Sequence, residues 1–492
     1  MIQISKSEYM LFLKHPAWLW LKKHDKAKLP PVDDNTQALF DTGFVFETYA
    51  EQLFPDGVRV GFDGYDEYLS LPKRTQEALQ AGAKTIFQGR FEYERQTFIC
   101  DVIAVIGDKE VDLYEIKSTT KAKPEHVDDL AFQVTVLEGC GFKVRNIAVI
   151  HADSEYVRSG DIDVKQFVAT TDVTEKVKAK RAYTKAQIKE ALAVVDASTI
   201  PDISPSHAAT GCLKDWLVVY RSLIPVETDS IYDLASMKAR DIGELESMGV
   251  TKLTDIPDNF RLTNGQRLQI QATKNNKALI DTNHIHDFLG ELTYPLYFFD
   301  YETLSSIVPP WDGTKPYQQI PFQYSLHILD ASGAELRHEE YLHRTNSNPA
   351  ESLSQALKSH IGEHGSVMAW FMGFEKSCNT TLGKLAPKYA EFYANLNARV
   401  VDLMIPFSSD WYVDKGFHGS ASIKDVLPVL VPELSYKELG IQEGGSAQRL
   451  WMEAVLDDKR VVEKDKILSD LVEYCKLDTL AMVEIYRKLL SL

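Results

Sequence analysis

The pattern of apolar and polar positions divides the first part of the chain into alternating strands and helices. Residues 97–106 (TFICDVIAVI) and 111–116 (VDLYEI) have strand patterns and are joined by a Gly-Asp turn. Residues 128–138 (DDLAFQVTVLE) have the apolar spacing of a helix, and the apolar run at 146–151 (NIAVIH) is typical of a buried strand. This order predicts an α/β domain over residues 1–195.

The remainder of the chain divides after the stretch 198–207, whose prolines and serines are typical of a linker. Residues 196–290 have helical patterns and form the predicted middle region. Residues 291–492 form a third predicted domain of α/β type, with strands at 294–300 and 322–329 and a final helix at 465–490.

Two helical segments bear on function. Residues 9–21 predict one amphipathic helix, because Lys14 and His15 interrupt the apolar run and exclude a signal peptide or a membrane span. Residues 231–256 contain a helix, a turn around Gly249 and a second short helix, which resembles helix-hairpin-helix elements whose turn amides contact nucleic-acid phosphates. A helical linker with the same turn explains that pattern equally well.

Composition narrows the class of protein. The chain has 492 residues, of which 44% are hydrophobic and 25% charged, as in an ordinary soluble protein of several domains. Its five cysteines lie far apart with no Cys-x-x-Cys pair, which argues against a disulfide framework and a zinc ribbon. We therefore expect a cytoplasmic protein without a membrane segment.

The net charge of −17 argues against non-specific binding of nucleic acid. Acid clusters that hold divalent cations also make the formal charge negative, although the occupied site is cationic. Basic residues gather at 117–123 and 176–189. A solvated helix face is the favoured interpretation of the second stretch.

The C-terminal region contains acids at spacings that suit metal binding. Asp300 and Glu302 are two apart in a strand, so both side chains emerge on one face with Cα atoms about 7 Å apart. Two unpaired carboxylates at ~4 Å repel by ~4 kcal/mol at an effective dielectric of about 20, and a cation removes that cost. Tyr474 and Asp478 are four apart and share a helix face. Oxygen ligands alone favour Mg²⁺ or Mn²⁺.

This arrangement, Asp-x-Glu in a strand and Tyr-x-x-x-Asp in a late helix, resembles the DnaQ-like DEDD exonucleases, which have an RNase H-like fold. The resemblance implies a 3′–5′ exonuclease in which Asp300, Glu302, Glu375 and Asp478 bind two metal ions and Tyr474 places the attacking water. Glu375 departs from the pattern, because the family usually has Asp there. Asp402 is an alternative fourth acid, with structural capping as its other interpretation.

The N-terminal region contains a second set of candidate residues. Asp101 precedes a turn and then Glu115 and Lys117, which share one face of a strand. Two carboxylates and a lysine suit metal-assisted attack of water on a phosphodiester. The set resembles the RecB-like branch of the PD-(D/E)XK nucleases, which have a restriction-endonuclease-like fold. That resemblance adds Glu47 as a metal ligand and Gln133 as a catalytic residue; a surface ion pair is the plainer interpretation of Glu115 and Lys117.

The segment SKSEY at 5–9 and the segment HPAWLWL at 15–21 resemble the opening of the nucleases associated with CRISPR adaptation. In those proteins four cysteines hold an iron–sulfur cluster. Here His15 stands in place of the first cysteine, and only Cys212 remains in the later region, near His207. We therefore expect no iron–sulfur cluster, and a packed remnant rather than a partial metal site at these three residues.

Over nearly the whole chain, the order of the three regions resembles a bacterial family of unassigned function. The sequence predicts a metal-dependent nuclease with two candidate active sites that hydrolyses DNA or RNA in repair, recombination or defence. Two alternatives remain at this point: one active site with the other domain as a nucleic-acid clamp, or a non-catalytic assembly module that binds nucleic acid. Self-association and a partner nuclease or helicase are left open.

Overall fold

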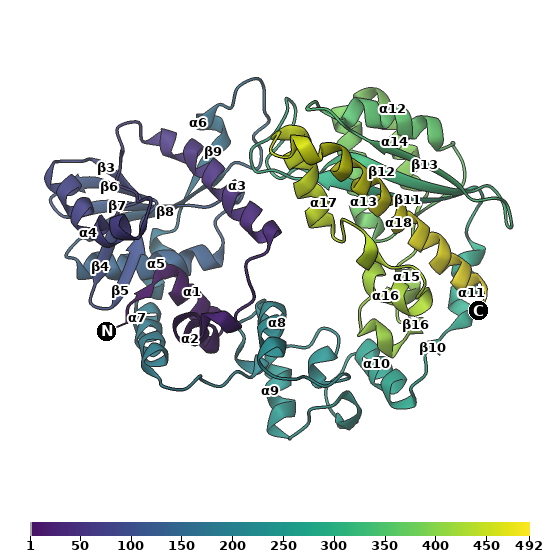
Figure 1. Cartoon of the computed structure of the whole chain (residues 1–492), viewed down its shortest axis with the longest axis horizontal. Helices are drawn as coiled ribbons and strands as arrows, with labels where there is room; N and C mark the ends of the chain where they lie inside the picture. The colour runs from purple at the N-terminus through teal and green to yellow at the C-terminus, as the bar shows by residue number, and fades with distance from the viewer. Residues whose placement is uncertain (1) are drawn as a thin grey trace. The chain divides into compact units, whose positions relative to one another are not determined.

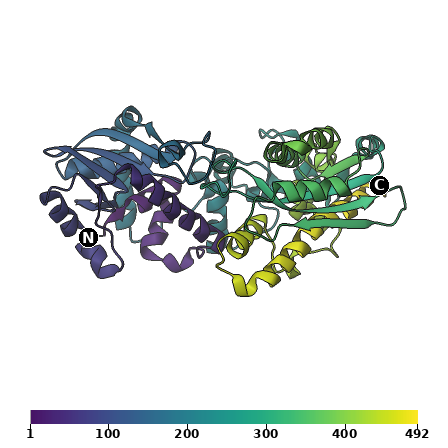
Figure 2. The same ribbon diagram turned by 90° about the horizontal axis from the view of Figure 1, so that it is seen from above.

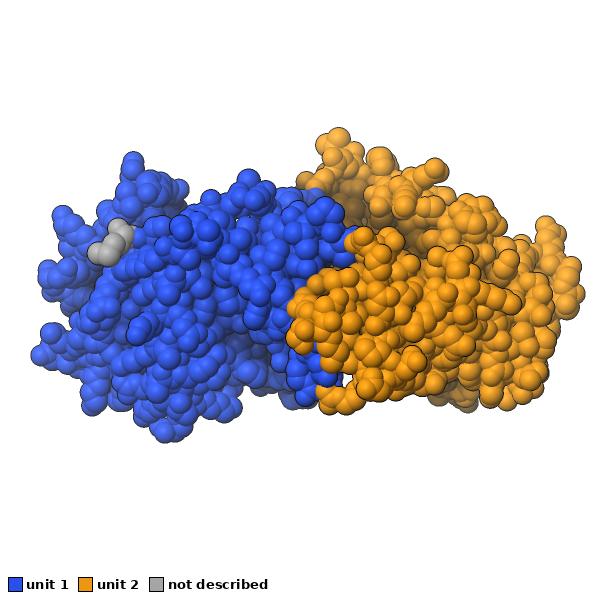
Figure 3. Space-filling model, turned by 90° about the horizontal axis from the view of Figure 1, so that it is seen from below, with its two compact units in different colours: residues 1–226, 238–244, 307–316 blue, residues 227–237, 245–306, 317–492 orange. Residues whose placement is uncertain are grey.

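The computed structural model describes residues 2–492 and divides the chain into two compact units (Figure 3). Unit 1 extends to Val226 and includes Lys238–Glu244 and Ile307–Pro316. Unit 2 comprises Glu227–Met237, Leu245–Ser306 and Tyr317–Leu492. The middle region of the sequence therefore contributes to both units.

Unit 1 is built on a mixed six-stranded sheet in the order β2-β3-β6-β7-β8-β9 (Figure 1). The neighbours β7 and β8 are parallel, and the helix α5 connects them. A smaller sheet has the order β1-β5-β4. The strands of unit 1 are β1 (Ile4–Ser5), β2 (Val58–Arg59), β3 (Thr85–Phe87), β4 (Arg90–Tyr93), β5 (Gln96–Ile99), β6 (Val102–Gly107), β7 (Glu110–Ile116), β8 (Lys143–Ala152) and β9 (Val168–Asp172).

Helices cover the core of unit 1. Val111 and Leu113 of β7 are fully buried and belong to one hydrophobic cluster with Leu130 and Leu137 of α5. Glu115 has the same parity along β7, so its side chain emerges on this helix-covered face. The helices of unit 1 are α1 (Lys6–Lys14), α2 (Pro16–His24), α3 (Asp34–Ala50), α4 (Tyr65–Gln80), α5 (Pro124–Gly139), α6 (Val164–Phe167), α7 (Thr174–Asp196) and α8 (Leu213–Leu223).

Two predicted elements of unit 1 were wrong in extent. The helix predicted at 9–21 is two helices, because the ring of Pro16 forces His15 into an extended conformation (φ −165°, ψ 128°). The strand predicted at 97–106 is two strands, β5 and β6, which lie in different sheets. The chain passes from one sheet to the other at Cys100 and Asp101. The apolar alternation continues through this separation, so periodicity alone does not reveal it.

Unit 2 is built on a five-stranded sheet in the order β13-β12-β11-β14-β15 (Figure 1). The pairs β13–β12 and β12–β11 are antiparallel, whereas the pairs β11–β14 and β14–β15 are parallel. A two-stranded sheet pairs β10 with β16. These strands are β10 (Leu279–Ile280), β11 (Leu296–Leu304), β12 (Ile320–Leu329), β13 (Arg337–Leu342), β14 (Ser366–Ala369), β15 (Val400–Asp402) and β16 (Tyr412–Val413).

Helices cover both faces of the five-stranded sheet, as Figure 2 shows. The green helices α12 and α14, with α13, pack on one face through an aromatic core that includes Tyr297, Phe299 and Tyr301. The yellow helix α18 crosses the other face, where Gln323 donates a hydrogen bond to its Leu471 carbonyl at 2.8 Å. The helices of unit 2 include α10 (Asn264–Asn275), α11 (Thr282–Gly290), α12 (Ala350–His360), α13 (Met372–Leu385), α14 (Ala390–Ala398), α15 (Ile405–Ser408), α16 (Ile423–Leu430), α17 (Gly444–Trp451) and α18 (Lys464–Leu490); α9 is Ala239–Ser247.

The α/β class is confirmed by these mixed sheets and their covering helices. The final helix was predicted within one residue, and the strand predicted at 322–329 lies inside β12. The strand predicted to end at Asp300 continues to Leu304, because its pairing with β12 continues past Glu302. Within residues 2–492, no helix combines the length and the apolarity that a bilayer crossing requires.

Candidate metal centre and a second charged cluster

Side chains alternate between the two faces of β11, and this alternation positions the first two candidate ligands of unit 2. Tyr297, Phe299 and Tyr301 point into the aromatic core. Asp300 and Glu302 have the opposite parity and therefore face α18. Glu302 is 7% exposed and Asp300 is half-buried, so the strand places two neighbouring carboxylates where water reaches them only partly.

Two further acids approach from helices. Asp478 lies in the middle of α18, is 8% exposed, and accepts a 2.7 Å hydrogen bond from the Tyr436 hydroxyl. Glu375 lies in the first turn of α13 and is 2% exposed, and its Oε2 atom has no hydrogen-bond partner among residues 2–492. An unpartnered carboxylate oxygen at this depth is costly unless a cation or a proton satisfies it.

Asp402 holds the start of α13 in place. Its two carboxylate oxygens accept hydrogen bonds from the amides of Phe371, Met372 and Met404, each at 3.0 Å. Phe371 has a left-handed backbone conformation (φ 70°), which these bonds stabilise. The carboxylate of Asp402 therefore caps the turn that carries Glu375, in agreement with its capping interpretation.

The acids of unit 2 disfavour one another's ionisation. Burial, with the charge of Asp478, raises the pKa of Asp300 well above its usual range. Burial and the neighbouring carboxylates likewise raise the pKa of Glu302 and of Glu375. Burial raises the pKa of Asp478 to about 7, although the Tyr436 hydroxyl and Lys424 oppose the rise. Four clustered carboxylates without an ion pair among the described residues are the condition that a divalent cation relieves.

Tyr474 and Lys424 border the acids. Burial and the charges of Asp478 and Glu302 raise the pKa of Tyr474, so its phenol stays protonated and can donate a hydrogen bond. The Lys424 ammonium lies 5.6 Å from the ring centre of Tyr436 and 5.7 Å from that of Tyr474. Lys424 lowers the pKa of both Glu302 and Asp478.

The donor set fits a divalent cation. Ligand atoms of Asp300, Glu302 and Cys475 lie within 4.8 Å of one another, and this is the one such group found among residues 2–492. The unpartnered oxygen of Glu375 adds a donor with no competing hydrogen bond. The sequence prediction did not include Cys475 or Tyr436, although Cys475 lies three residues before Asp478 and therefore on the same helix face.

The second set of candidates forms a hydrogen-bonded cluster in unit 1. Glu115 is 1% exposed, and both its oxygens accept. Its Oε1 accepts from the ammonium groups of Lys117 and Lys6, each at 2.6 Å, and its Oε2 accepts from the Gln133 amide at 2.6 Å. Asp129 joins the cluster by accepting from Lys117 and Gln133, each at 2.9 Å.

Lys6 and Asp129 were not predicted from the sequence. Asp129 lies four residues before Gln133 in α5, so helical spacing was a usable signal. Lys6 lies 109 residues from Glu115 along the chain, and no local pattern connects the two.

The two lysines stabilise the charged form of Glu115. Burial opposes the ionisation of Glu115, but the charges of Lys117 and Lys6 lower its pKa well below the usual range. Asp101 accepts a 2.8 Å hydrogen bond from the Ile116 amide, and burial and the charge of Glu115 raise its pKa to about 7. This cluster therefore differs from Asp300, Glu302, Glu375 and Asp478, which have no ion-paired lysine among residues 2–492.

Glu47 approaches the unit 1 cluster from α3. The side-chain amide of Gln88 donates a hydrogen bond to it, and the backbone amide of Gln88 donates to the carbonyl of Asp101 at 3.4 Å. Burial raises the pKa of Glu47, and the charge of Glu115 contributes to the rise. Gln88 thus connects Glu47 with the strand end that carries Asp101.

The region around His15 is closely packed. His15 is fully buried and stacks on Trp216 with ring centres 3.7 Å apart. One ring nitrogen accepts the Ala17 amide at 3.1 Å, and the other lies 3.0 Å from the Ser204 carbonyl. Both nitrogens are engaged, so His15 has none left for a metal.

The segment 231–256 has the predicted helix and turn, but its second helix is only the short 3₁₀ turn Leu253–Asp255. The amides of Met248, Gly249 and Val250 all donate to carbonyls of α9, at 2.9–3.1 Å. Since these amides are already bonded, the linker interpretation fits this turn better than phosphate contact does.

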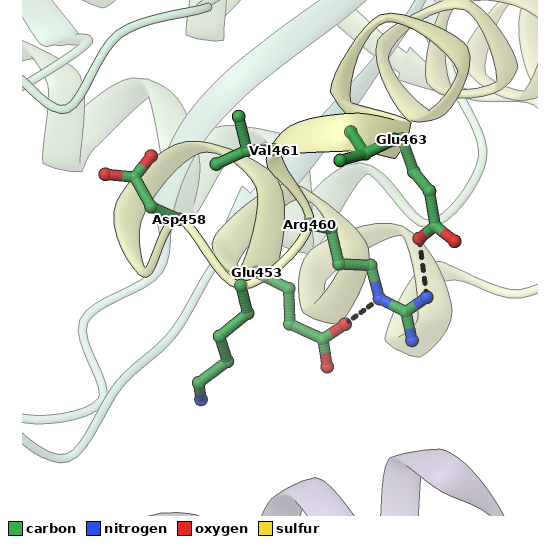
Figure 4. A pocket seen from close by; sticks show the side chains of 7 residues that line it. Glu453, Asp458, Arg460, Val461 and Glu463 are labelled. Carbon is green, nitrogen blue, oxygen red and sulfur yellow. Dashed lines mark hydrogen bonds and ion pairs between the residues drawn. The ribbon is translucent and has the colours of Figure 1, made fainter.

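A surface pocket of about 660 Å³ lies elsewhere in unit 2 (Figure 4). It is lined by Glu453 and by residues 458–463. Arg460 forms ion pairs with Glu453 and Glu463, each at 2.7 Å. None of the candidate metal ligands lines this pocket.

Comparisons with known proteins match parts of the chain. Residues 297–422 match a family described as "Domain of unknown function (DUF2779)". The matched residues include Asp300, Glu302 and Glu375 but not Asp478. An uncharacterized protein of Mycoplasma genitalium is 23% identical over 245 residues, which cover 45% of this chain and 36% of the relative. An uncharacterized protein of Ureaplasma parvum is 24% identical over 237 residues, covering 43% and 33%. The chain thus spans about a third of the length of these curated relatives.

Proposed function

We propose that the protein is a metal-dependent nuclease whose principal hydrolytic centre lies in unit 2 and is of the DEDD exonuclease type. One observation carries the proposal: among residues 2–492, the buried carboxylates Glu302, Glu375 and Asp478 and the half-buried Asp300 lie together without an ion pair. Oxygen donors of this kind suit Mg²⁺ or Mn²⁺. The antiparallel strands β11–β13, continued by the parallel strands β14 and β15, support an RNase H-like domain.

The four acids Asp300, Glu302, Glu375 and Asp478 would hold the metal ions. Such ions supply an activated water and stabilise the leaving oxygen of a phosphodiester. The protonated phenol of Tyr474 donates a hydrogen bond that orients the attacking water. Lys424 is exposed and its positive charge acts on Glu302 and Asp478, so it attracts the phosphate of the substrate.

Gly444 of α17 lies beside Glu302. A Cβ atom added at Gly444 would lie 3.9 Å from Glu302 Oε2, so a longer side chain at this position would extend over the carboxylate.

The cluster of unit 1 is proposed as a RecB-like PD-(D/E)XK centre of secondary importance. In the present arrangement Lys6 and Lys117 both occupy Glu115 Oε1, so a metal ion must displace Lys6 to reach that atom. This arrangement favours one principal hydrolytic centre, with unit 1 acting mainly on the binding of nucleic acid.

Digestion of end-labelled single- and double-stranded DNA and RNA with Mg²⁺ or Mn²⁺ tests the proposal. The variant Asp300→Ala should abolish degradation, whereas Lys117→Ala should reduce it less. Glu473→Gln changes an exposed acid of the same helix as Asp478 and should keep wild-type activity. Equal degradation by wild type and Asp300→Ala would refute the unit 2 assignment, and retained binding without any degradation would favour a non-catalytic module.

A further inference from the structure

Cys475 lies inside the acid centre of unit 2. It is fully buried in α18, one residue after Tyr474 and three before Asp478. Its sulfur lies 4.0 Å from both the carbonyl oxygen and Oδ2 of Asp300. The sulfur belongs to a group of ligand atoms that lie within 4.8 Å of one another, so the thiol is within reach of a cation held by Asp300 and Glu302.

The distances suit a mixed oxygen and sulfur site. Zinc–sulfur bonds of about 2.3 Å and zinc–oxygen bonds of about 2.0–2.2 Å, at tetrahedral angles, put sulfur and oxygen about 3.5 Å apart. The observed 4.0 Å between Cys475 Sγ and Asp300 Oδ2 is close to this separation. Only a small side-chain adjustment is needed for both atoms to contact one cation.

A second observation points to a cation at the same place. The buried side chain of Glu302 has no hydrogen bond or ion pair among residues 2–492 and contributes an oxygen to the same group of atoms. Glu375 Oε2 is also buried and unpartnered. The thiol therefore lies among acceptors that need a positive charge, not among apolar groups that only need to be packed.

We propose that Cys475, with Asp300 and Glu302, makes the centre of unit 2 a site for a thiophilic divalent cation of the Zn²⁺ class. Ligation replaces the thiol proton with a sulfur–metal bond, and the proton leaves to solvent. Zinc and cobalt accept thiolate sulfur readily, whereas Mg²⁺ and Mn²⁺ favour oxygen. The consequence for hydrolysis rests on the proposed function: a thiophilic cation occupies Asp300 and Glu302 and competes with the Mg²⁺ or Mn²⁺ that supports it.

Cys378 offers a matched control for Cys475. It is also fully buried, and it lies three residues after Glu375 in α13. It packs in the aromatic core with Phe299 and Leu382 and does not belong to the group of ligand atoms. Replacing it removes a buried thiol near the centre without removing the proposed ligand.

Titration of the metal-stripped full-length protein with Co²⁺ tests the proposal without any activity measurement. Wild type and Cys378→Ser should develop a sulfur-to-cobalt charge-transfer absorption in the near ultraviolet. Cys475→Ser, Cys475→Ala and Asp300→Asn should lack it. Retention of this absorption in Cys475→Ser, or its loss in Cys378→Ser alone, would overturn the assignment.

Calorimetric titration separates ligation from folding. Loss of an outer-shell partner of a metal ligand weakens metal binding by about 10- to 100-fold. Loss of the sulfur itself should weaken Zn²⁺ binding by at least as much. Binding of Mn²⁺ should change by less than about threefold, because Mn²⁺ favours oxygen ligands. An equal loss for both ions would show that Cys475 is only a packing residue. A protein that binds Co²⁺ through Cys475 but degrades no nucleic acid would refute the proposed function and leave this inference intact.

Discussion

Replacement of Asp478 by asparagine should stabilise the metal-free protein at neutral pH. The folded state raises the pKa of Asp478 from 3.8 to about 7, chiefly through burial. At pH values between 3.8 and about 7, Asp478 of the folded protein keeps a proton that the unfolded chain has lost. The free energy of unfolding therefore falls as pH rises from about 4 to about 7. Above pH 7 the folded protein bears the full cost of ionising the buried Asp478 carboxyl.

The magnitude follows from the size of the shift. A rise from 3.8 to about 7 is about 3 units, and at 1.36 kcal/mol per unit the cost is on the order of 4 kcal/mol above pH 7. About half of this change should occur between pH 5 and pH 7. In Asp478→Asn the side chain cannot ionise, and its amide oxygen can still accept the hydrogen bond from the Tyr436 hydroxyl.

Native-state hydrogen exchange of the α18 amides, in the presence of a chelator, measures the effect in unit 2. The free energy of opening in wild type should fall from pH 5 to pH 7. The fall should be smaller in Asp478→Asn by the share of Asp478, while Asp300, Glu302 and Glu375, whose pKa values are also raised, keep their own shares. The exposed acid Asp465 lies in the same helix, and Asp465→Asn should retain the wild-type dependence. The reasoning is refuted if wild-type stability rises over this range, or if Asp478→Asn is less stable than wild type at pH 8.

Three further predictions concern charged side chains. Glu115→Gln should destabilise unit 1 by about 3–5 kcal/mol in urea unfolding, because it leaves the ammonium groups of Lys6 and Lys117 without their shared carboxylate; a loss below about 1 kcal/mol would contradict this. Lys424→Met removes a positive charge that acts on Glu302 and Asp478, so it should strengthen Mn²⁺ binding in calorimetry. It should also weaken nucleic-acid binding, because the same charge attracts phosphate. Unchanged Mn²⁺ affinity would contradict this. Burial lowers the pKa of His15 from 6.5 to about 4, so stability should be lost as pH falls through this range, by about 3 kcal/mol in total; α2 amides whose exchange shows no such loss would contradict this.

Local periodicity was sufficient to place the acids of unit 2. The two-residue repeat of β11 separates Asp300 and Glu302 from the aromatic core, and the four-residue spacing of α18 puts Tyr474 and Asp478 on one face. Glu375 could also be located, because it follows a buried strand. These signals depend only on the geometry of single elements, which the sequence specifies directly.

The cluster of unit 1 was only partly predictable, because it depends on contacts between distant segments. Lys6 reaches Glu115 only after α1 packs against the sheet, and no spacing along the chain encodes that contact. The separation at Asp101 was hidden because the apolar alternation is the same on both sides of it. Burial also decides which acids stay ionised, and burial follows from the packing of the whole unit.

The alternation of β11 has a consequence for how chains of this type change in length during evolution. A single residue inserted between Leu296 and Phe299 would exchange the two faces of everything that follows. Tyr301 would then occupy the ligand side, and Asp300 would enter the aromatic core. Insertions and deletions should therefore accumulate outside this strand, in connections such as residues 305–319 and 330–336. Chains that differ greatly in total length can then keep the spacing of two residues between the first two acids unchanged.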